Sequence, residues 1–109
     1  MISKNPYSES IIEEYNSYDK DKTIELINSA QESFMEWKNF KLEKRLEIIE
    51  KIKSNLVLKK MDCAYKITEE MGKPITEAIA EIEKCIWLCD YYIENGDKFL
   101  KDEIIKTDA

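Results

Sequence analysis

The most reactive side chains in this sequence are those of three cysteines. They are Cys63, Cys85 and Cys89. Cys85 and Cys89 lie four positions apart, so a helix would place both thiols on one face. They could form half of a zinc site, but zinc needs about four ligands, and only Cys63 or carboxylates could complete the set. The alternative is that these small, soft side chains fill a seam between helices, which is their commoner use.

The sequence contains no histidine, which narrows the possible chemistry. Its absence removes Ser-His and Cys-His nucleophile pairs and histidine metal ligands together. A disulfide between Cys85 and Cys89 is geometrically poor, because Cα atoms at this helical spacing lie near the upper limit for bridging. The odd number of cysteines indicates reduced cytosolic thiols. We therefore expect no catalytic residue and no metal ligand in this chain, because no nucleophile, base and oxyanion donor come together.

Aromatic and acidic side chains have both a functional and a plainer interpretation. The aromatic residues that could line a ligand box are Trp37, Trp87, Tyr91 and Tyr92. Packing is the commoner use of such residues. The carboxylates that could pair for acid–base work are Glu69, Glu70, Glu77, Glu81 and Glu83. Acidic runs on helices are usually solvated faces. The lone Gly72 cannot form a phosphate-binding loop, so we expect no cofactor-binding residue.

Length and charge exclude several classes of protein. The 109 residues suffice for one small domain, and 43% hydrophobic with 37% charged residues is typical of helices with charged outer faces. The net charge is −6, and basic residues are interspersed with acidic ones, which argues against nucleic acid and anionic membranes as partners. No apolar run approaches a membrane span, and the first residues do not resemble a leader peptide. We expect a soluble, cytoplasmic protein.

The elements that would position these side chains are mainly helical. Residues 1–18 contain Asn5-Pro6 and a Ser-Glu-Ser, which predict a short β-hairpin or an extended arm, with its turn near residues 7–10. Asp19 is a suitable N-cap for a first helix from about Lys20 to about Phe40. The apolar residues on one face of that helix are Ile24, Ile27, Ala30, Phe34 and Trp37.

A second helical stretch runs from about Leu42 to Met71. Its apolar stripe is Leu42, Leu46, Ile49, Ile52 and Leu56. The stripe loses its phase at Val57 and Leu58, so we expect a bend, or a break into two helices, near Lys59.

The segment "MGKP" predicts the end of one helix and the start of another. Gly72 follows the last periodic residue, where a left-handed glycine closes a helix. Pro74 suits the first position of the next helix, which we expect to run to about Leu100. Gly96 is expected to loosen its final turn. The stripe of this last helix is Ala78, Ile79, Ile82, Ile86, Cys89 and Ile93.

Taken together, these motifs resemble the N-terminal portion of the aldehyde dehydrogenase superfamily. "NPYSESIIEEY" is similar to the family's opening hairpin, and "AQESFMEWKNFKLEKRLEIIEKI" is similar to its Phe-x-x-Trp and Arg-containing helices. "EEMGKPITEAIAEIEKCIWLCDYY" is the most specific piece and resembles the succinate-semialdehyde dehydrogenase-like branch. The closing "KTDA" resembles the approach to the family's oligomerisation hairpin. One departure is the apolar "NLVLKKMD", which would expose Val57 and Leu58.

The resemblance implies a function that this segment cannot carry out alone. Family members oxidise an aldehyde to an acid with NAD or NADP, using a Cys nucleophile and a Glu that activates water. In such proteins the Cys, the Glu and the dinucleotide-binding glycines all lie downstream of a segment like this one. Cys63, Cys85 and Cys89 match peripheral helices, so none of them inherits the nucleophile's role. Residues 19–109 would then be a helical part of an incomplete cofactor-binding domain that itself binds no NAD or NADP.

Two hypotheses follow. The first is an inactive fragment of an NAD(P)-dependent aldehyde dehydrogenase, whose partner is the remainder of the subunit. The second is a stand-alone helical module, descended from such a gene, that self-associates or binds another protein through apolar helix faces. The first is favoured. Under either hypothesis we expect a homo-oligomer or a larger subunit.

Overall fold

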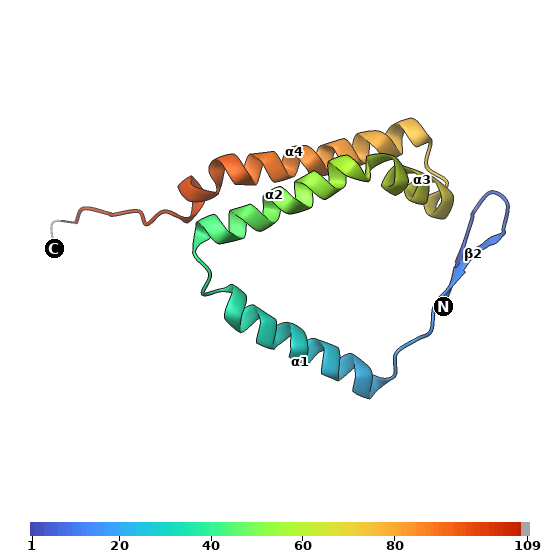
Figure 1. Cartoon of the computed structure of the whole chain (residues 1–109), viewed down its shortest axis with the longest axis horizontal. Helices are drawn as coiled ribbons and strands as arrows, with labels where there is room; N and C mark the ends of the chain where they lie inside the picture. The colour runs from blue at the N-terminus through green and yellow to red at the C-terminus, as the bar shows by residue number, and fades with distance from the viewer. Residues whose placement is uncertain (108–109) are drawn as a thin grey trace.

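The chain forms an open frame of one hairpin and four helices, seen in a computed structural model that describes residues 1–107 (Figure 1). Its radius of gyration is 19.8 Å and its extents are 67 × 40 × 27 Å. A compact domain of this length would have a radius of gyration of about 13 Å. The predicted mainly helical fold with a short N-terminal hairpin is confirmed, but the helices do not close around one core.

The N-terminal hairpin pairs β1 (Ile2–Lys4) with β2 (Ile11–Glu14) in antiparallel register. The Asn5 N–H donates to the Ser10 carbonyl over 2.9 Å, and the Asn5 side chain accepts from two backbone N–H groups of the turn. Glu9 takes a left-handed φ of 58° within this turn. The hairpin alternative, with its turn close to the expected position, is therefore confirmed.

Helix α1 (Lys20–Trp37) begins as the sequence predicts. The Asp19 carboxylate caps it, accepting from the Lys22 N–H over 2.7 Å. The predicted end at Phe40 is three residues too late. The chain leaves the helix after Trp37 in a tight turn, in which the Phe40 N–H donates to the Trp37 carbonyl over 3.0 Å.

The expected discontinuity near Lys59 is a break between two helices. Helix α2 (Leu42–Leu58) ends there and α3 (Lys60–Met71) begins after this single residue, whose φ of −101° and ψ of 15° depart from helical geometry. The change of direction leaves Val57 and Leu58 on the surface, and Leu58 is 79% exposed. The apolar departure from the family pattern therefore does expose these side chains.

The "MGKP" segment separates α3 from α4 (Ile75–Leu100), with one correction. Gly72 is left-handed, with a φ of 68°, and its N–H donates to the Thr68 carbonyl over 2.9 Å, as expected of a helix end. Pro74, however, flanks α4 and is not its first residue. Its ψ of 136° is extended, and its carbonyl accepts from the N–H groups of both Glu77 and Ala78. Pro74 therefore acts through its carbonyl as the N-cap residue.

The core is a narrow seam in which α4 packs along α2 and α3 (Figure 1). Its buried apolar residues are Ala64, Ala78 and Ile82. Gly96 is buried within α4, and a Cβ built there would lie 3.2 Å from Leu46 Cδ2. Gly96 therefore lets α2 approach α4 closely. The predicted loosening of the final turn is wrong, because α4 continues through Gly96 to Leu100.

None of the helices within residues 1–107 is both long enough and apolar enough to cross a membrane.

Candidate functional site

The three thiols lie on two neighbouring helices without forming a cluster. Cys63 lies on α3 and is half-buried, and Cys89 lies half-buried on α4. Cys85 is exposed on α4. Within residues 1–107, no group of three or more Cys, Asp or Glu side chains is placed to hold a metal ion. The half-site considered for Cys85 and Cys89 therefore gains no further ligands in this part of the chain.

The exposed Cys85 belongs to a shallow hollow of about 230 Å³ on the outer side of α4. The hollow is lined by Glu81, Lys84, Cys85, Trp87 and Leu88. All of these residues belong to one helix, and no second element in the described part of the chain walls the hollow. It is an uncovered strip of helix, unlike the enclosed pockets that bind small molecules.

The aromatic residues considered for a ligand box are divided between distant elements. Trp37 lies at the end of α1, where its ring is 5.8 Å from that of Phe40. On α4, Tyr91 lies edge-on to Tyr92 at 5.6 Å and is tilted against Phe99 at 5.8 Å. The sequence analysis missed Phe99, although Phe99 follows Tyr91 by eight positions, a spacing that returns to the same helical face.

The acidic residues considered for acid–base work mainly join elements together. Glu83 pairs with Lys60 of α3 over 2.9 Å, and Glu81 pairs with Lys73. The hydrogen bond to Glu81 raises the pKa of Lys73 above its ordinary value. Glu81 and Lys84 are three residues apart, a spacing that allows an ion pair within the helix. The partner of Glu81 is instead Lys73, in the turn before α4. These are exposed ion pairs, which position helices weakly.

A further ion pair joins α2 to α4. The Lys53 ammonium lies 2.7 Å from an Asp90 oxygen and 3.3 Å from a Glu50 oxygen. The hydrogen bonds to Asp90 and then Glu50 raise the pKa of Lys53. These charges thus reinforce the contact between α2 and α4.

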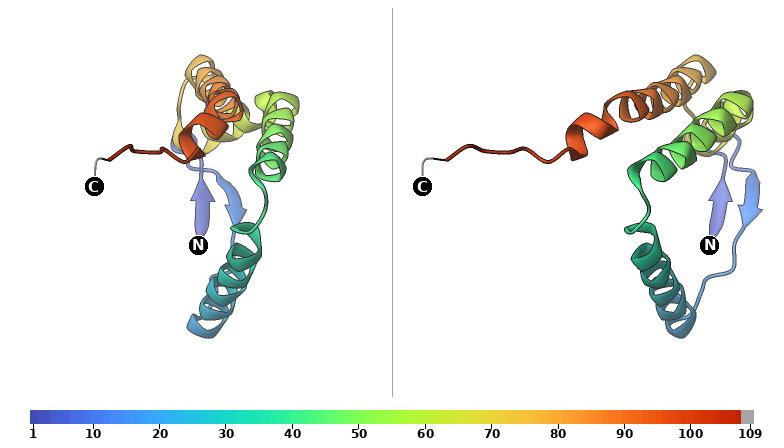
Figure 2. Two further views of the ribbon diagram at one scale, coloured as in Figure 1. Left: turned by 90° about the vertical axis from the view of Figure 1, so that its left-hand side faces the viewer. Right: turned by 60° about the vertical axis from the view of Figure 1, so that its left-hand side comes forward.

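The most prominent surface feature is instead the uncovered apolar face of α1. No residue of α1 is buried, and the helix stands apart from α2, α3 and α4 in every view (Figure 2). Ile27 and Phe34, from its predicted apolar stripe, are 62% and 52% exposed. An isolated globular protein rarely leaves so continuous an apolar stripe in water, so this face fits contact with another body of protein.

These features define a class: a helical frame with a small core of its own and an uncovered apolar face on α1. The matching family is consistent with that class, since the model of the aldehyde dehydrogenase family matches residues 1–109. The chain belongs to the aldehyde dehydrogenase family.

Two relatives illustrate the match. A protein named probable succinate-semialdehyde dehydrogenase (NADP(+)) from Synechocystis is 29% identical over 105 residues, which cover 96% of this chain and 23% of the relative. Succinate semialdehyde dehydrogenase (NAD(P)+) Sad from Escherichia coli is 39% identical over 74 residues, covering 68% of this chain and 16% of that protein. The resemblance to the succinate-semialdehyde dehydrogenase-like branch is confirmed.

A solved structure supports the frame itself. The glyceraldehyde-3-phosphate dehydrogenase GapN of Methanocaldococcus jannaschii, crystallised with NADP, superimposes with a TM-score of 0.89 at 29% identity. The match covers 99% of this chain and 24% of GapN. The chain thus spans only about a quarter, or less, of the length of these relatives, and it adopts the same arrangement that GapN gives to the matching part of its own chain.

Proposed function

We propose that this chain is the N-terminal helical portion of an NAD(P)-dependent aldehyde dehydrogenase, and that it is not catalytic alone. The parent reaction would be oxidation of an aldehyde, such as succinate semialdehyde, to the carboxylic acid. In this proposal residues 19–109 cover one side of the cofactor domain, the remainder of the subunit covers α1, and NAD or NADP binds to that remainder. The names of the relatives support the aldehyde and the cofactor class.

The observation that carries the proposal is the open frame. A chain of this length with a radius of gyration of 19.8 Å leaves most of its helix faces in water. Only three apolar residues among those described are buried: Ala64, Ala78 and Ile82. Such a small core is far from what an independent domain of this size normally buries. The superposition on GapN supports a role as one part of such a dehydrogenase.

The predicted inactivity rests on the positions of the thiols. A cysteine nucleophile needs an adjacent base or a lowered pKa, together with a donor for the developing oxyanion. Cys63 is half-buried on α3, Cys89 is half-buried on α4, and Cys85 lies on the open strip of α4. The hollow at Cys85 is walled by α4 alone, so it does not enclose an aldehyde and a nicotinamide.

The direct test is an assay of the purified chain. Succinate semialdehyde and several other aldehydes are supplied with NAD or NADP, and the absorbance of the reduced cofactor is followed. Escherichia coli Sad serves as the positive control. We expect no rate above the buffer blank. Turnover that scales with the concentration of this chain, and that persists through further purification, would refute the proposed inactivity.

The alternative is a self-associating or partner-binding module. The observation in its support is a second uncovered surface, on α4. Trp87 is 66% exposed there beside Leu88. Light scattering during dilution separates the two functions. A discrete dimer or tetramer with cooperative melting would favour the module. Aggregation or a molten state, with helical signal but without fixed tertiary packing, would favour an incomplete part of a dehydrogenase.

A further inference from the structure

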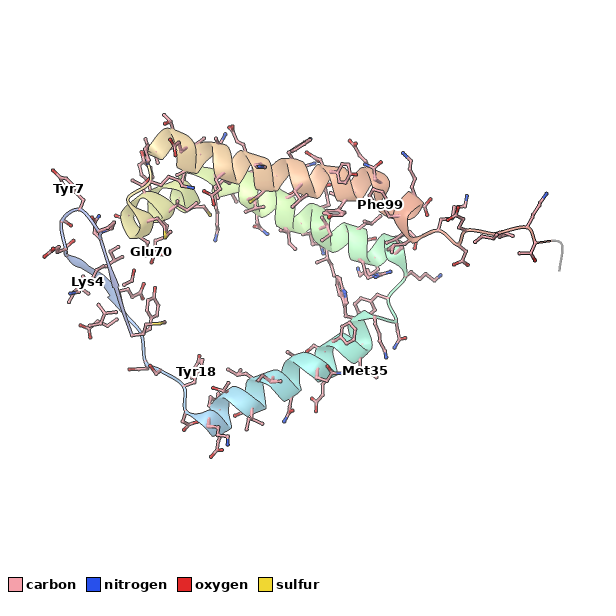
Figure 3. The ribbon with its side chains drawn as sticks, turned by 180° about the vertical axis from the view of Figure 1, so that it is seen from behind. Lys4, Tyr7, Tyr18, Met35, Glu70 and Phe99 are labelled. Atoms are coloured by element: carbon pink, nitrogen blue, oxygen red, sulfur yellow. The ribbon has the colours of Figure 1, made fainter. Side chains whose placement is uncertain are left out.

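The hairpin meets the end of α3 at two points, far apart in sequence. The Ser3 hydroxyl donates to a Glu70 carboxylate oxygen over 3.0 Å. A Cβ built on Gly72 would lie 3.0 Å from Pro6 Cγ, so the hairpin turn rests directly on the glycine. Figure 3 shows Glu70 on the side of α3 that lies nearest the hairpin. We call Ser3, Pro6, Glu70 and Gly72 the hairpin latch.

Gly72 is required here for two separate reasons. Its φ of 68° is a left-handed conformation that most side chains disfavour. An asparagine would tolerate that conformation far better than an alanine. The approach of Pro6 is a different constraint, because any side chain at position 72 would bring its Cβ against a rigid proline ring. The requirement for glycine thus exceeds what ending α3 demands.

The hairpin depends on this contact for its stability. A two-stranded sheet is marginal in water unless it packs on another element. Among the described elements, α3 is the helix that β1 contacts substantially. The latch therefore supplies the surface that the hairpin otherwise lacks.

The latch also determines what happens to α1. The chain runs from the hairpin through residues 15–19 into α1, and then through residues 38–41 into α2. Helix α1 packs extensively on none of the described elements, so these two connections are its main attachment. With the hairpin attached to α3, both connections are anchored to the same helical body (Figure 1). With the hairpin released, α1 would be tethered at one end and would sample many more orientations.

We propose that the hairpin latch closes the frame and holds the apolar face of α1 in position before any partner covers it. Ser3, Pro6, Glu70 and Gly72 are positioning residues, and their role does not require the chain to be part of a dehydrogenase. The proposal can therefore fail while the proposed function stands, and the reverse also holds.

The test is amide hydrogen exchange on the whole chain, comparing Gly72→Asn with the control Gly96→Ala. The reporters are the Asn5 and Tyr15 amides, which donate within the hairpin to Ser10 and Met1 carbonyls. In Gly72→Asn their protection should fall by about tenfold or more, while amides of α2 and α4 keep theirs. Gly96→Ala adds the same Cβ within the helical seam, against a flexible leucine methyl, and should leave the hairpin protected.

Two further variants separate the latch from a general loss of folding. Pro6→Ala removes Cγ, the atom that a Cβ at position 72 would meet. The nearest remaining atom of residue 6 is then its Cβ, 3.9 Å from the Cβ at position 72, which is an ordinary contact distance. In this background Gly72→Asn should cause no further loss of protection. Ser3→Ala, which introduces no backbone strain, should lower hairpin protection by itself because its bond to Glu70 is lost. Hairpin amides that exchange freely in the unaltered chain, or that are equally protected in Gly72→Asn and Ser3→Ala, would overturn the proposal.

Discussion

Helices α1 and α4 carry similar sequence signals and meet opposite environments. Both have an apolar stripe at helical spacing, and both begin at the residues that the sequence indicates, within one position. The stripe of α4 packs on α2 and α3 and contains the buried Ala78 and Ile82, whereas α1 buries nothing. An apolar stripe therefore predicts a helix and the face that it will bury. It does not predict which element covers that face, because that element lies elsewhere in the chain or in a partner.

The largest test of this contrast compares one isoleucine from each helix. Ile82 is 7% exposed, so Ile82→Ala removes packed methylenes and should lower the free energy of unfolding by about 2–4 kcal/mol. Ile27→Ala removes the same atoms from the open face of α1 and should change it by no more than about 0.5 kcal/mol. Urea denaturation followed by circular dichroism measures both. Equal losses would mean that α1 has a packing partner within the isolated chain.

The hairpin and helices were largely predictable because their signals are local. Asp19 caps α1 through its own carboxylate, and Gly72 closes α3 through its own φ. The break at Lys59 follows from a stripe that loses its phase. Pro74 was misplaced by one residue, because a proline fits both positions and only the extended ψ decides between them.

The interactions between elements were much less predictable. The pairing of Glu81 with Lys73 depends on how the chain turns before α4, which residue spacing within a helix does not contain. The meeting of Gly72 with Pro6 joins positions 66 residues apart and depends on the path of the entire frame. For the candidate site, the sequence predicted that no nucleophile, base and oxyanion donor come together, and this stays a prediction. The uncovered face of α1 became visible only from the arrangement of the helices in space. The assignment of residues 19–109 to a cofactor domain stays a prediction.

A substitution on the open face of α1 should have an effect of intermediate size, on the association of copies of the chain with one another. Phe34→Gln replaces an exposed aromatic ring on the open face without adding charge. If that face drives contacts between copies, light scattering at a given concentration should fall, while the free energy of unfolding changes by no more than about 0.5 kcal/mol. Tyr7→Gln, at the hairpin turn, is the matched control and should leave scattering unchanged. A similar decrease in both variants would indicate that the α1 face is not the surface involved.

The smallest effect concerns charge at the seam between α2 and α4. The pKa of Lys53 is raised above its ordinary value of 10.5 by its bonds to Asp90 and Glu50, so the folded state holds this proton more tightly than the unfolded chain. The resulting stabilisation is complete below pH 10.5 and is lost as the pH rises through the raised pKa. Thermal melting of the unaltered chain and of Lys53→Met should therefore differ slightly at neutral pH and converge at strongly alkaline pH. A difference that persists in alkali would assign the effect to packing of the lysine stem.

The openness of the frame has a calorimetric consequence. Unfolding raises heat capacity in proportion to the apolar surface that becomes hydrated, by about 12–15 cal/mol/K per residue in ordinary globular proteins. Few of the described side chains leave water when this chain folds. Its heat capacity change of unfolding should therefore be much smaller than its length suggests, and its free energy of unfolding should curve less with temperature. The remainder of that heat capacity change would appear when a partner binds, which would make assembly the more temperature-sensitive of the two events.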